Sequence, residues 1–131
     1  MIFSAFLNRY SAVRYAAKKR PEQFLEDPDL IGSILSTGTG ESSRADAAFL
    51  CSCYFADPLE VKPFMERLGV TTVELLGCEG VVSEVEEKLN ILPEPELERW
   101  VDLNYDLGRR SELHAASAHL LHVGRKPANP L

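Results

Sequence analysis

Four segments of the chain carry the hydrophobic pattern of strands. Residues 1–7 form a short apolar run with no polar face, which is typical of a strand covered on both sides. Residues 71–77 are rich in β-branched side chains and end in glycine. Residues 119–125 form a third apolar run, closed by a glycine and a proline. The apolar and aromatic residues 47–55 are also expected to be extended.

Helical patterns lie between these segments. Residues 11–19 place small apolar and basic positions on different sides of a helix, and Pro21 is expected to end it. Residues 22–35 predict one or two further helical turns, broken at Asp27-Pro28. The alternation of strands and helices predicts an α/β protein.

Residues 57–69 carry the clearest local signal in the chain. Asp57 is a good N-cap, Pro58 suits the first helical position, and Glu60 stands where a capping box needs an acid. Gly69 offers a C-terminal cap before the strand at 71–77. A helix followed at once by a strand is half of a crossover unit.

Two acidic helices are predicted between the second and third strands, over residues 83–92 and 96–108. Their acids are expected to be a solvated surface. The second helix is expected to pack inward through an apolar face: Leu97, Trp100, Val101 and Tyr105.

Composition and charge narrow the class of protein. The chain has 131 residues, 45% hydrophobic and 26% charged, which suits a single soluble domain over residues 1–131. The formal net charge of −6 argues against a general affinity for nucleic acid. No apolar run reaches the ~18 residues that a membrane span needs.

The cysteines and the first residues bear on the compartment. Cys51, Cys53 and Cys78 are odd in number and lack C-x-x-C spacing, so we expect a reducing, cytoplasmic setting without disulfides. Residues 1–20 contain cations and no acid, as mitochondrial targeting peptides do. Their strand and helix pattern favours an ordinary folded segment instead.

Two weak ligand signals have plain explanations. The Gly38-x-Gly40 pair lies in a loop without the strand and helix that a phosphate cradle needs. His119 and His122 are three apart, so on a strand they point to opposite faces and do not form a metal pair. No metal site is expected.

The order of these pieces resembles the C-terminal half of a class I S-adenosylmethionine-dependent methyltransferase. The strongest segments are Tyr54-Phe55-x-x-Pro58-x-Glu60, leading to Gly69, and SAHLLHVGRKP at residues 117–127. The resemblance covers nearly the whole chain. It depends on the order and spacing of motifs that are individually modest.

The resemblance implies a Rossmann-like fold. Residues 1–7, 71–77 and 119–125 correspond to the fifth, sixth and seventh strands of the family. They would form a three-stranded mixed sheet, in the order 5-7-6, with helices packed on it. The closing strand would run antiparallel between the other two, with Arg125 and Lys126 at its exposed end.

The first four strands of the family are missing from this sequence, and so is the glycine-rich loop that holds the cofactor in such enzymes. We therefore expect a truncated domain that does not bind S-adenosylmethionine by itself. The opening strand would have an unpaired edge beside Ile2, Phe3 and Phe6. That edge would favour a homodimer, pairing with a complementary N-terminal half, or aggregation.

Ligands of open α/β sheets lie beyond the carboxyl ends of the parallel strands. The candidate substrate-binding residues there, some placed by the resemblance, are Asn8, Arg9, Tyr10, Tyr54, Glu79 and His119. Asn8 and Arg9 would orient a polar or anionic acceptor, and Glu79 would accept a proton or a hydrogen bond. In a purely structural alternative, Arg9 pairs with Glu79 and Tyr10 packs under the next helix. His119 is either a base near the substrate or a buried histidine bonded to backbone.

Three functions stay open at this stage. The first is the substrate-side half of a small-molecule methyltransferase, inactive alone and with its acceptor unidentified. The second is a non-catalytic interaction module that pairs through its exposed sheet edge. The third is an unrelated small α/β protein, which a different strand order would favour.

Overall fold

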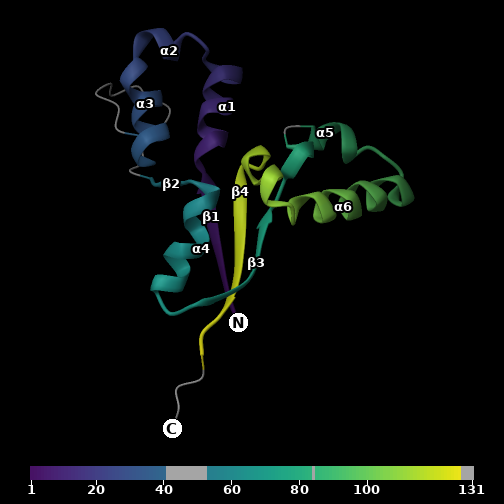
Figure 1. Cartoon of the computed structure of the whole chain (residues 1–131). Helices are drawn as coiled ribbons and strands as arrows, with labels where there is room; N and C mark the ends of the chain where they lie inside the picture. The colour runs from purple at the N-terminus through teal and green to yellow at the C-terminus, as the bar shows by residue number, and fades with distance from the viewer. Residues whose placement is uncertain (41–52, 84, 128–131) are drawn as a thin grey trace.

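The computed structural model describes residues 1–40, 53–83 and 85–127. Strands and helices alternate along the chain (Figure 1). The strands are β1 (Ile2–Asn8), β2 (Phe55–Ala56), β3 (Thr71–Gly77) and β4 (His119–Arg125). The α-helices are α1 (Arg9–Lys19), α2 (Gln23–Glu26), α3 (Pro28–Thr37), α4 (Pro58–Arg67), α5 (Glu86–Leu89) and α6 (Glu94–Gly108). Two 3₁₀ helices are η1 (Gly80–Val82) and η2 (Ser111–Ala116).

The strands form one mixed sheet in the order β2-β1-β4-β3. β4 is antiparallel to both of its neighbours, pairing with β1 from Ile2 to Leu7 and with β3 from Thr71 to Gly77. β1 and β3 therefore run parallel to each other with β4 between them. The predicted arrangement of these three segments is confirmed.

The expectation of only three strands is wrong, because β2 adds a fourth beyond β1. β2 is parallel to β1 and contacts it only at Leu7 and Asn8. Phe55 is held in place because its N–H donates to the carbonyl of Gly38 at 2.7 Å. The segment predicted to be extended, residues 47–55, ends here: Tyr54 forms a bridge with Thr39, and Phe55 is in β2. Residues 47–52 of that segment lie outside the described part.

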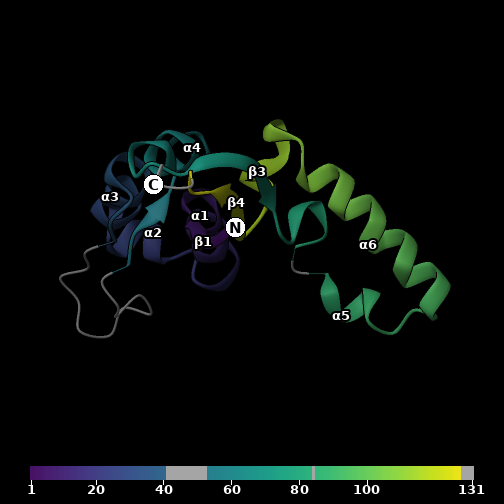
Figure 2. The same cartoon turned by 90° about the horizontal axis from the view of Figure 1, so that it is seen from below.

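The core lies on one side of the sheet. One cluster of buried residues joins α4 to the strands: Ala56, Val61, Met65, Val70 and Leu120. A second cluster joins α1 and α3 to β2: Ala12, Leu30, Ile34 and Phe55. Figure 1 shows α1 continuing beyond the end of β1, and Figure 2 shows α2 to α4 on one side of the strands and α6 projecting on the other.

Local sequence rules account for most helix ends. The complete capping box predicted for α4 is present, with Asp57 and Glu60 in their expected roles. Asp27 caps α3, so the predicted break before Pro28 is confirmed. Gly38, with φ of 79°, ends α3 in the left-handed conformation. It is a helix cap rather than part of a phosphate cradle.

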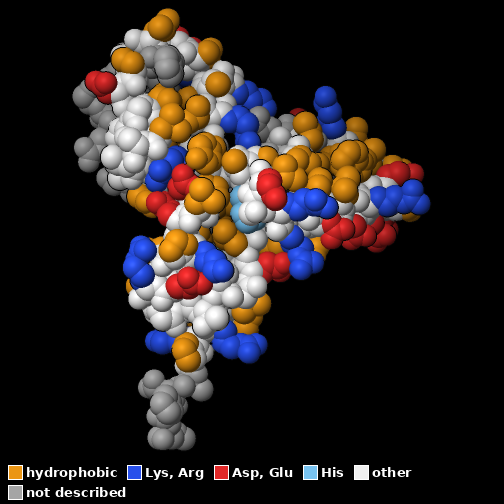
Figure 3. Space-filling view, in the orientation of Figure 1, with side chains coloured by type: hydrophobic (Ala, Val, Ile, Leu, Met, Phe, Trp, Pro, Cys, Tyr) orange, Lys and Arg blue, Asp and Glu red, His pale blue; other side chains and the backbone are white. Residues whose placement is uncertain are grey.

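The predicted inward packing of α6 is wrong for most of that helix. Three of its apolar side chains are largely exposed: Trp100 (41%), Val101 (58%) and Tyr105 (51%). Only Gly108, at its end, is buried, because its Cα lies against the backbone of Gly77. Figure 3 shows hydrophobic side chains gathered between α5 and α6. Neither α6 nor any other helix in the described ranges has the length and apolar character needed to cross a membrane.

His122 is a buried polar residue at the centre of the sheet. Its Nε2 lies 3.0 Å from Thr72 Oγ1, and its Nδ1 is buried without a hydrogen-bond partner among the described residues. Burial lowers the pKa of His122, although the charge of Glu66 partly opposes this. The ring is therefore neutral in the folded state at neutral pH.

We expect this histidine to make the fold sensitive to mild acid. A histidine whose pKa is lower in the folded state stabilises the fold above its unfolded value, 6.5, and this is lost as pH falls below that value. The free energy of unfolding from urea titrations should decrease between about pH 7.5 and about pH 5.5. His122→Leu should have a shallower pH dependence. An equal slope in both proteins would contradict this assignment.

Candidate functional site

The candidate site lies at the carboxyl ends of β1 and β3. β1 ends at Asn8, β3 ends at Gly77, and β4 begins between them at His119. Leu7 pairs with His119, so the residues that follow β1 and β3 meet at one end of the sheet. The candidate residues fall into two groups there, one around Arg9 and one around Glu79.

Arg9 is the centre of the first group. Its side chain is buried, and each guanidinium nitrogen donates a hydrogen bond. Nε donates to the carbonyl of Phe55 at 3.3 Å, and Nη1 donates to the carbonyl of Leu35 at 3.1 Å. Nη2 donates to Glu60 Oε1 at 3.3 Å, and Asp57 lies 3.9 Å from Nη1. These contacts tie the end of α3, β2 and the start of α4 together, so Arg9 pairs with these acids and not with Glu79.

Two tyrosines complete the group around Arg9. Tyr10 donates its hydroxyl hydrogen to Asp57 at 3.1 Å, and Tyr54 donates to Glu60 at 2.6 Å. The hydrogen bond to Asp57, followed by its negative charge, raises the pKa of Tyr10. The hydrogen bond to Glu60 and burial raise the pKa of Tyr54. Both phenols stay protonated at neutral pH, and both rings are partly exposed.

Asn8 is fully buried and joins the two groups. Its Nδ2 donates to the carbonyls of His114 and Ser117, each at 2.8 Å. Its Oδ1 accepts from the N–H of Tyr10 and so caps α1. Asn8 therefore holds η2 against the start of α1 and has no hydrogen left to offer an acceptor.

Glu79 and His119 form the second group. Glu79 Oε2 accepts from the backbone N–H groups of Ala118 and His119, at 3.1 and 2.9 Å. Its Oε1 lies 2.5 Å from His119 Nδ1. Burial alone would raise the pKa of Glu79, but the hydrogen bonds from the side chain and backbone of His119 outweigh it and lower that pKa.

This contact orients the ring of His119. An ionised carboxylate only accepts hydrogen bonds, so Nδ1 carries a hydrogen, and in the neutral form of the ring Nε2 would have the lone pair. The side chain of His119 is 49% exposed. A carboxylate that orients an imidazole with a free Nε2 is the arrangement of a general base. The alternative of a buried histidine bonded to backbone is wrong for this residue.

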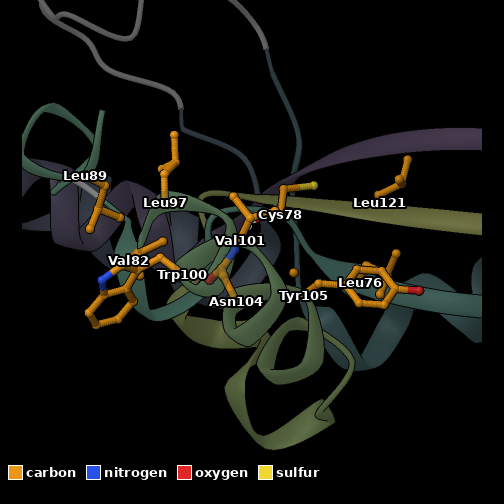
Figure 4. Close-up of a pocket in the computed structure, with 11 residues that line it drawn as sticks. Leu76, Cys78, Val82, Leu89, Leu97, Trp100, Val101, Asn104, Tyr105 and Leu121 are labelled. Atoms are coloured by element: carbon orange, nitrogen blue, oxygen red, sulfur yellow. Dashed lines mark hydrogen bonds between the residues drawn. The ribbon is translucent and has the colours of Figure 1, made fainter. Parts of the chain in front are cut away.

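An apolar hollow is lined in part by Cys78, the sequence neighbour of Glu79. It has a volume of about 370 Å³ and lies between the strands β3 and β4 and the inner side of α6 (Figure 4). Its lining includes Leu76, Cys78, Trp100, Val101, Asn104 and Leu121. His119 and Leu121 are two residues apart on β4, so His119 is on the sheet face that bounds the hollow.

Two polar residues that the sequence did not single out hold the Glu79 loop. Ser117 Oγ accepts from the N–H of Gly80 at 2.9 Å, and Asn104 Nδ2 donates to the carbonyl of Cys78 at 2.9 Å. Ser117 is fully buried. Serine and asparagine in loops and helices carry no distinctive pattern, so only the fold identifies them.

The left-handed glycines and the metal-ligating side chains of the described ranges have these surroundings. Gly38 and Gly69 adopt left-handed conformations after helices, and Gly80 lies against Asn104, so none of them forms a cradle for a nucleotide. No cluster of three metal-ligating side chains occurs in the described ranges. The thiol of Cys78 has a pKa raised by burial and by the charge of Glu79, so it is not an activated nucleophile.

We expect Asn8 to be essential for stability. Asn8→Ala removes a helix cap and two buried hydrogen bonds, so it should lower the free energy of unfolding by about 2–4 kcal/mol. Asn90→Ala, at an exposed position, is the matched control and should change stability little. Equal urea midpoints for the two variants would contradict the structural role of Asn8.

Glu79 should stabilise the fold only when it is ionised. Its pKa is lower in the folded state, so the stabilisation is present above the unfolded value, near 4.5, and is lost as pH falls through the folded value. Glu79→Gln should cost about 1–2 kcal/mol at neutral pH, and the difference should shrink below about pH 4. Glu112→Gln, at an exposed position, should behave like the wild type in the same titration.

Comparisons with known proteins give no relative for this chain. No protein-family model, no curated protein and no solved structure matches it. The geometry of the chain itself is therefore the basis for proposing a function.

Proposed function

We propose that this chain supplies the acceptor-binding half of an S-adenosylmethionine-dependent methyltransferase that acts on a small molecule. The observation that carries the proposal is the strand order β1-β4-β3, with β4 antiparallel between two parallel strands. The sequence resemblance implies that order for the last three strands of the family. The chain would be inactive by itself on this proposal, because its 131 residues contain no G-x-G-x-G loop of the kind that holds the cofactor in the family.

The role of this chain would be to position and deprotonate the acceptor. His119 Nε2 would take the proton of an acceptor hydroxyl or amine, and Glu79 would hold the imidazole and stabilise its charged form. The apolar hollow beside Leu121 would hold the body of the molecule. This favours an acceptor with an apolar body and one polar reacting group.

The buried group around Arg9 would have a supporting role. The guanidinium is committed to Glu60 and two carbonyls, so it orients β2 and α4 and does not bind the acceptor itself. The hydroxyls of Tyr10 and Tyr54 are committed to carboxylates in the same way. The Glu79–His119 pair is the group with a reactive atom left exposed.

The proposal is tested by supplying the missing half. The first four strands and glycine-rich loop of a small-molecule methyltransferase would be fused ahead of Met1, and methyl transfer to phenols, catechols and aromatic amines measured by mass spectrometry. Transfer is expected only in the fusion. A folded fusion that binds S-adenosylmethionine but methylates no acceptor would contradict the proposal, as would a folded fusion that binds none.

Within an active fusion, His119→Gln should lower the rate of transfer by about 10²–10⁴-fold, because it removes the base. Glu112→Gln is the matched control, since this carboxylate is exposed and accepts a hydrogen bond from the neighbouring Ser111. If His119→Gln and Glu112→Gln have the same rate, His119 is not the base.

A second candidate function is a non-catalytic interaction module. The observation that favours it is the side of β1 away from β4, where residues 2–6 have no strand partner in the described part of the chain. An unpaired strand edge is a template for another strand. A variant that prevents another strand from pairing with β1 should leave the hydrogen bond between Glu79 and His119 intact.

A further inference from the structure

We propose that β1 pairs with β1 of a second copy of this chain, in an antiparallel register centred on Ser4. The proposal develops the interaction function and does not depend on methyl transfer. Its basis is the free edge of β1, which β2 covers only at Leu7 and Asn8. Residues 2–6 have no strand partner on that side within the described ranges.

The direction of the backbone groups along this edge follows from one hydrogen bond. The N–H of Asn8 donates to the carbonyl of Ala118 at 3.0 Å, on the side of β4. Backbone groups alternate in direction along a strand, so even-numbered residues of β1 point toward β4. The N–H and C=O groups of Phe3 and Ala5 therefore point outward, to the free edge.

A two-fold axis at Ser4 satisfies these groups. In that register Phe3 of one copy lies opposite Ala5 of the other, and each such pair exchanges two hydrogen bonds. The two pairs together make four. The proposed β1–β1 pairing uses residues 2–6, and it ends there because β2 begins to cover the edge of β1 at Leu7. The contact is closed by symmetry, so it makes a dimer and not a filament.

The side chains of the free stretch are compatible with self-pairing. Residues 2–6 read IFSAF, with none of the charges or prolines that commonly protect an edge strand. Ile2 of the second copy falls opposite Phe6, beside a hollow of about 390 Å³. Phe6, Ala56, Val61 and Phe64 contribute to the lining of this hollow. Ile2 would cover apolar surface there that is now open.

Charges beside the edge are also complementary under this symmetry. α4 begins just after β2, which pairs with Leu7, and it ends just before Val70, which lies against Gly124, the partner of Ile2. Glu60 is therefore near the Leu7 end of β1 and Arg67 near the Ile2 end. The two-fold axis reverses one α4 against the other on the same face of the continuous sheet. The end of α4 that carries Glu60 in one copy is then directed toward the end of α4 that carries Arg67 in the other copy.

The size of the contact sets its strength. Two strands of five residues and their flanking side chains fall at the low end of interface sizes, below the roughly 1,200 Å² of stable complexes. The dimer should therefore be weak and depend on protein concentration. Residues 2–6 would then be exposed at low concentration and paired at high concentration.

Light scattering and sedimentation over micromolar to millimolar protein would test the pairing, together with hydrogen exchange at single amides. We expect a monomer that becomes a dimer, with the amides of Phe3 and Ala5 protected only in the dimer. Ala5→Pro removes an outward N–H without touching the ladder to β4, and it should weaken the dimer by about tenfold to a hundredfold. Ala5→Val keeps that N–H and is the matched control.

A second variant tests the proposal even if Ala5→Pro does not fold. Arg67→Glu, at the exposed end of α4, should weaken the dimer several-fold at low salt and little at high salt. Dimers unaffected by either variant would overturn the proposal. A protein that stays monomeric at every concentration would also overturn the proposal. This holds whether hydrogen exchange at the amides of Phe3 and Ala5 is fast or slow in that monomer. Large open aggregates would contradict the closed two-fold contact.

Discussion

The two ladders of β4 are the interaction on which the rest of the structure depends. β4 is the last strand in the chain, yet it lies between β1, the first, and β3. Its second residue, Leu120, is fully buried against α4. Its first residue, His119, is brought beside both Leu7 and Cys78. The pairing therefore closes a loop of more than a hundred residues and creates the end of the sheet at which the candidate site lies.

The two polar groups at that end of the sheet differ in how much of their hydrogen-bonding capacity is already used. Arg9 and Asn8 are buried and fully committed to carbonyls and carboxylates, as buried polar groups must be if they are not to destabilise the fold. Glu79 is committed as well, but to a residue that keeps one reactive nitrogen exposed. Charged hydrogen bonds thus have a structural role in the group around Arg9, whereas in the Glu79–His119 pair they orient a candidate base.

The surface that α6 leaves open is a consequence of how that helix is attached. Contact between Gly108 and Gly77 brings the backbones close together at one end of α6, while the other end projects from the sheet (Figure 2). The apolar residues along α6, between its two ends, face a hollow instead of a packed layer. The free edge of β1 is on the other side of the sheet, so the chain carries two distinct uncovered apolar surfaces. Each has its own geometry, one suited to a small molecule and one to a strand.

The sequence alone determined the elements whose signals are local. The capping box at Asp57, the break at Asp27-Pro28 and the three long strands follow from side-chain chemistry within a few residues, and the resemblance correctly implied the position of β4. Only the tertiary structure decided the side-chain contacts between residues that are far apart in the sequence. The partners of Arg9 leave no pattern in sequence, and neither does the pairing of Glu79 with His119 or of β2 with β1. The amphipathic pattern of α6 predicted a packing face but not whether another layer covers it, because burial depends on what the rest of the chain places opposite a helix.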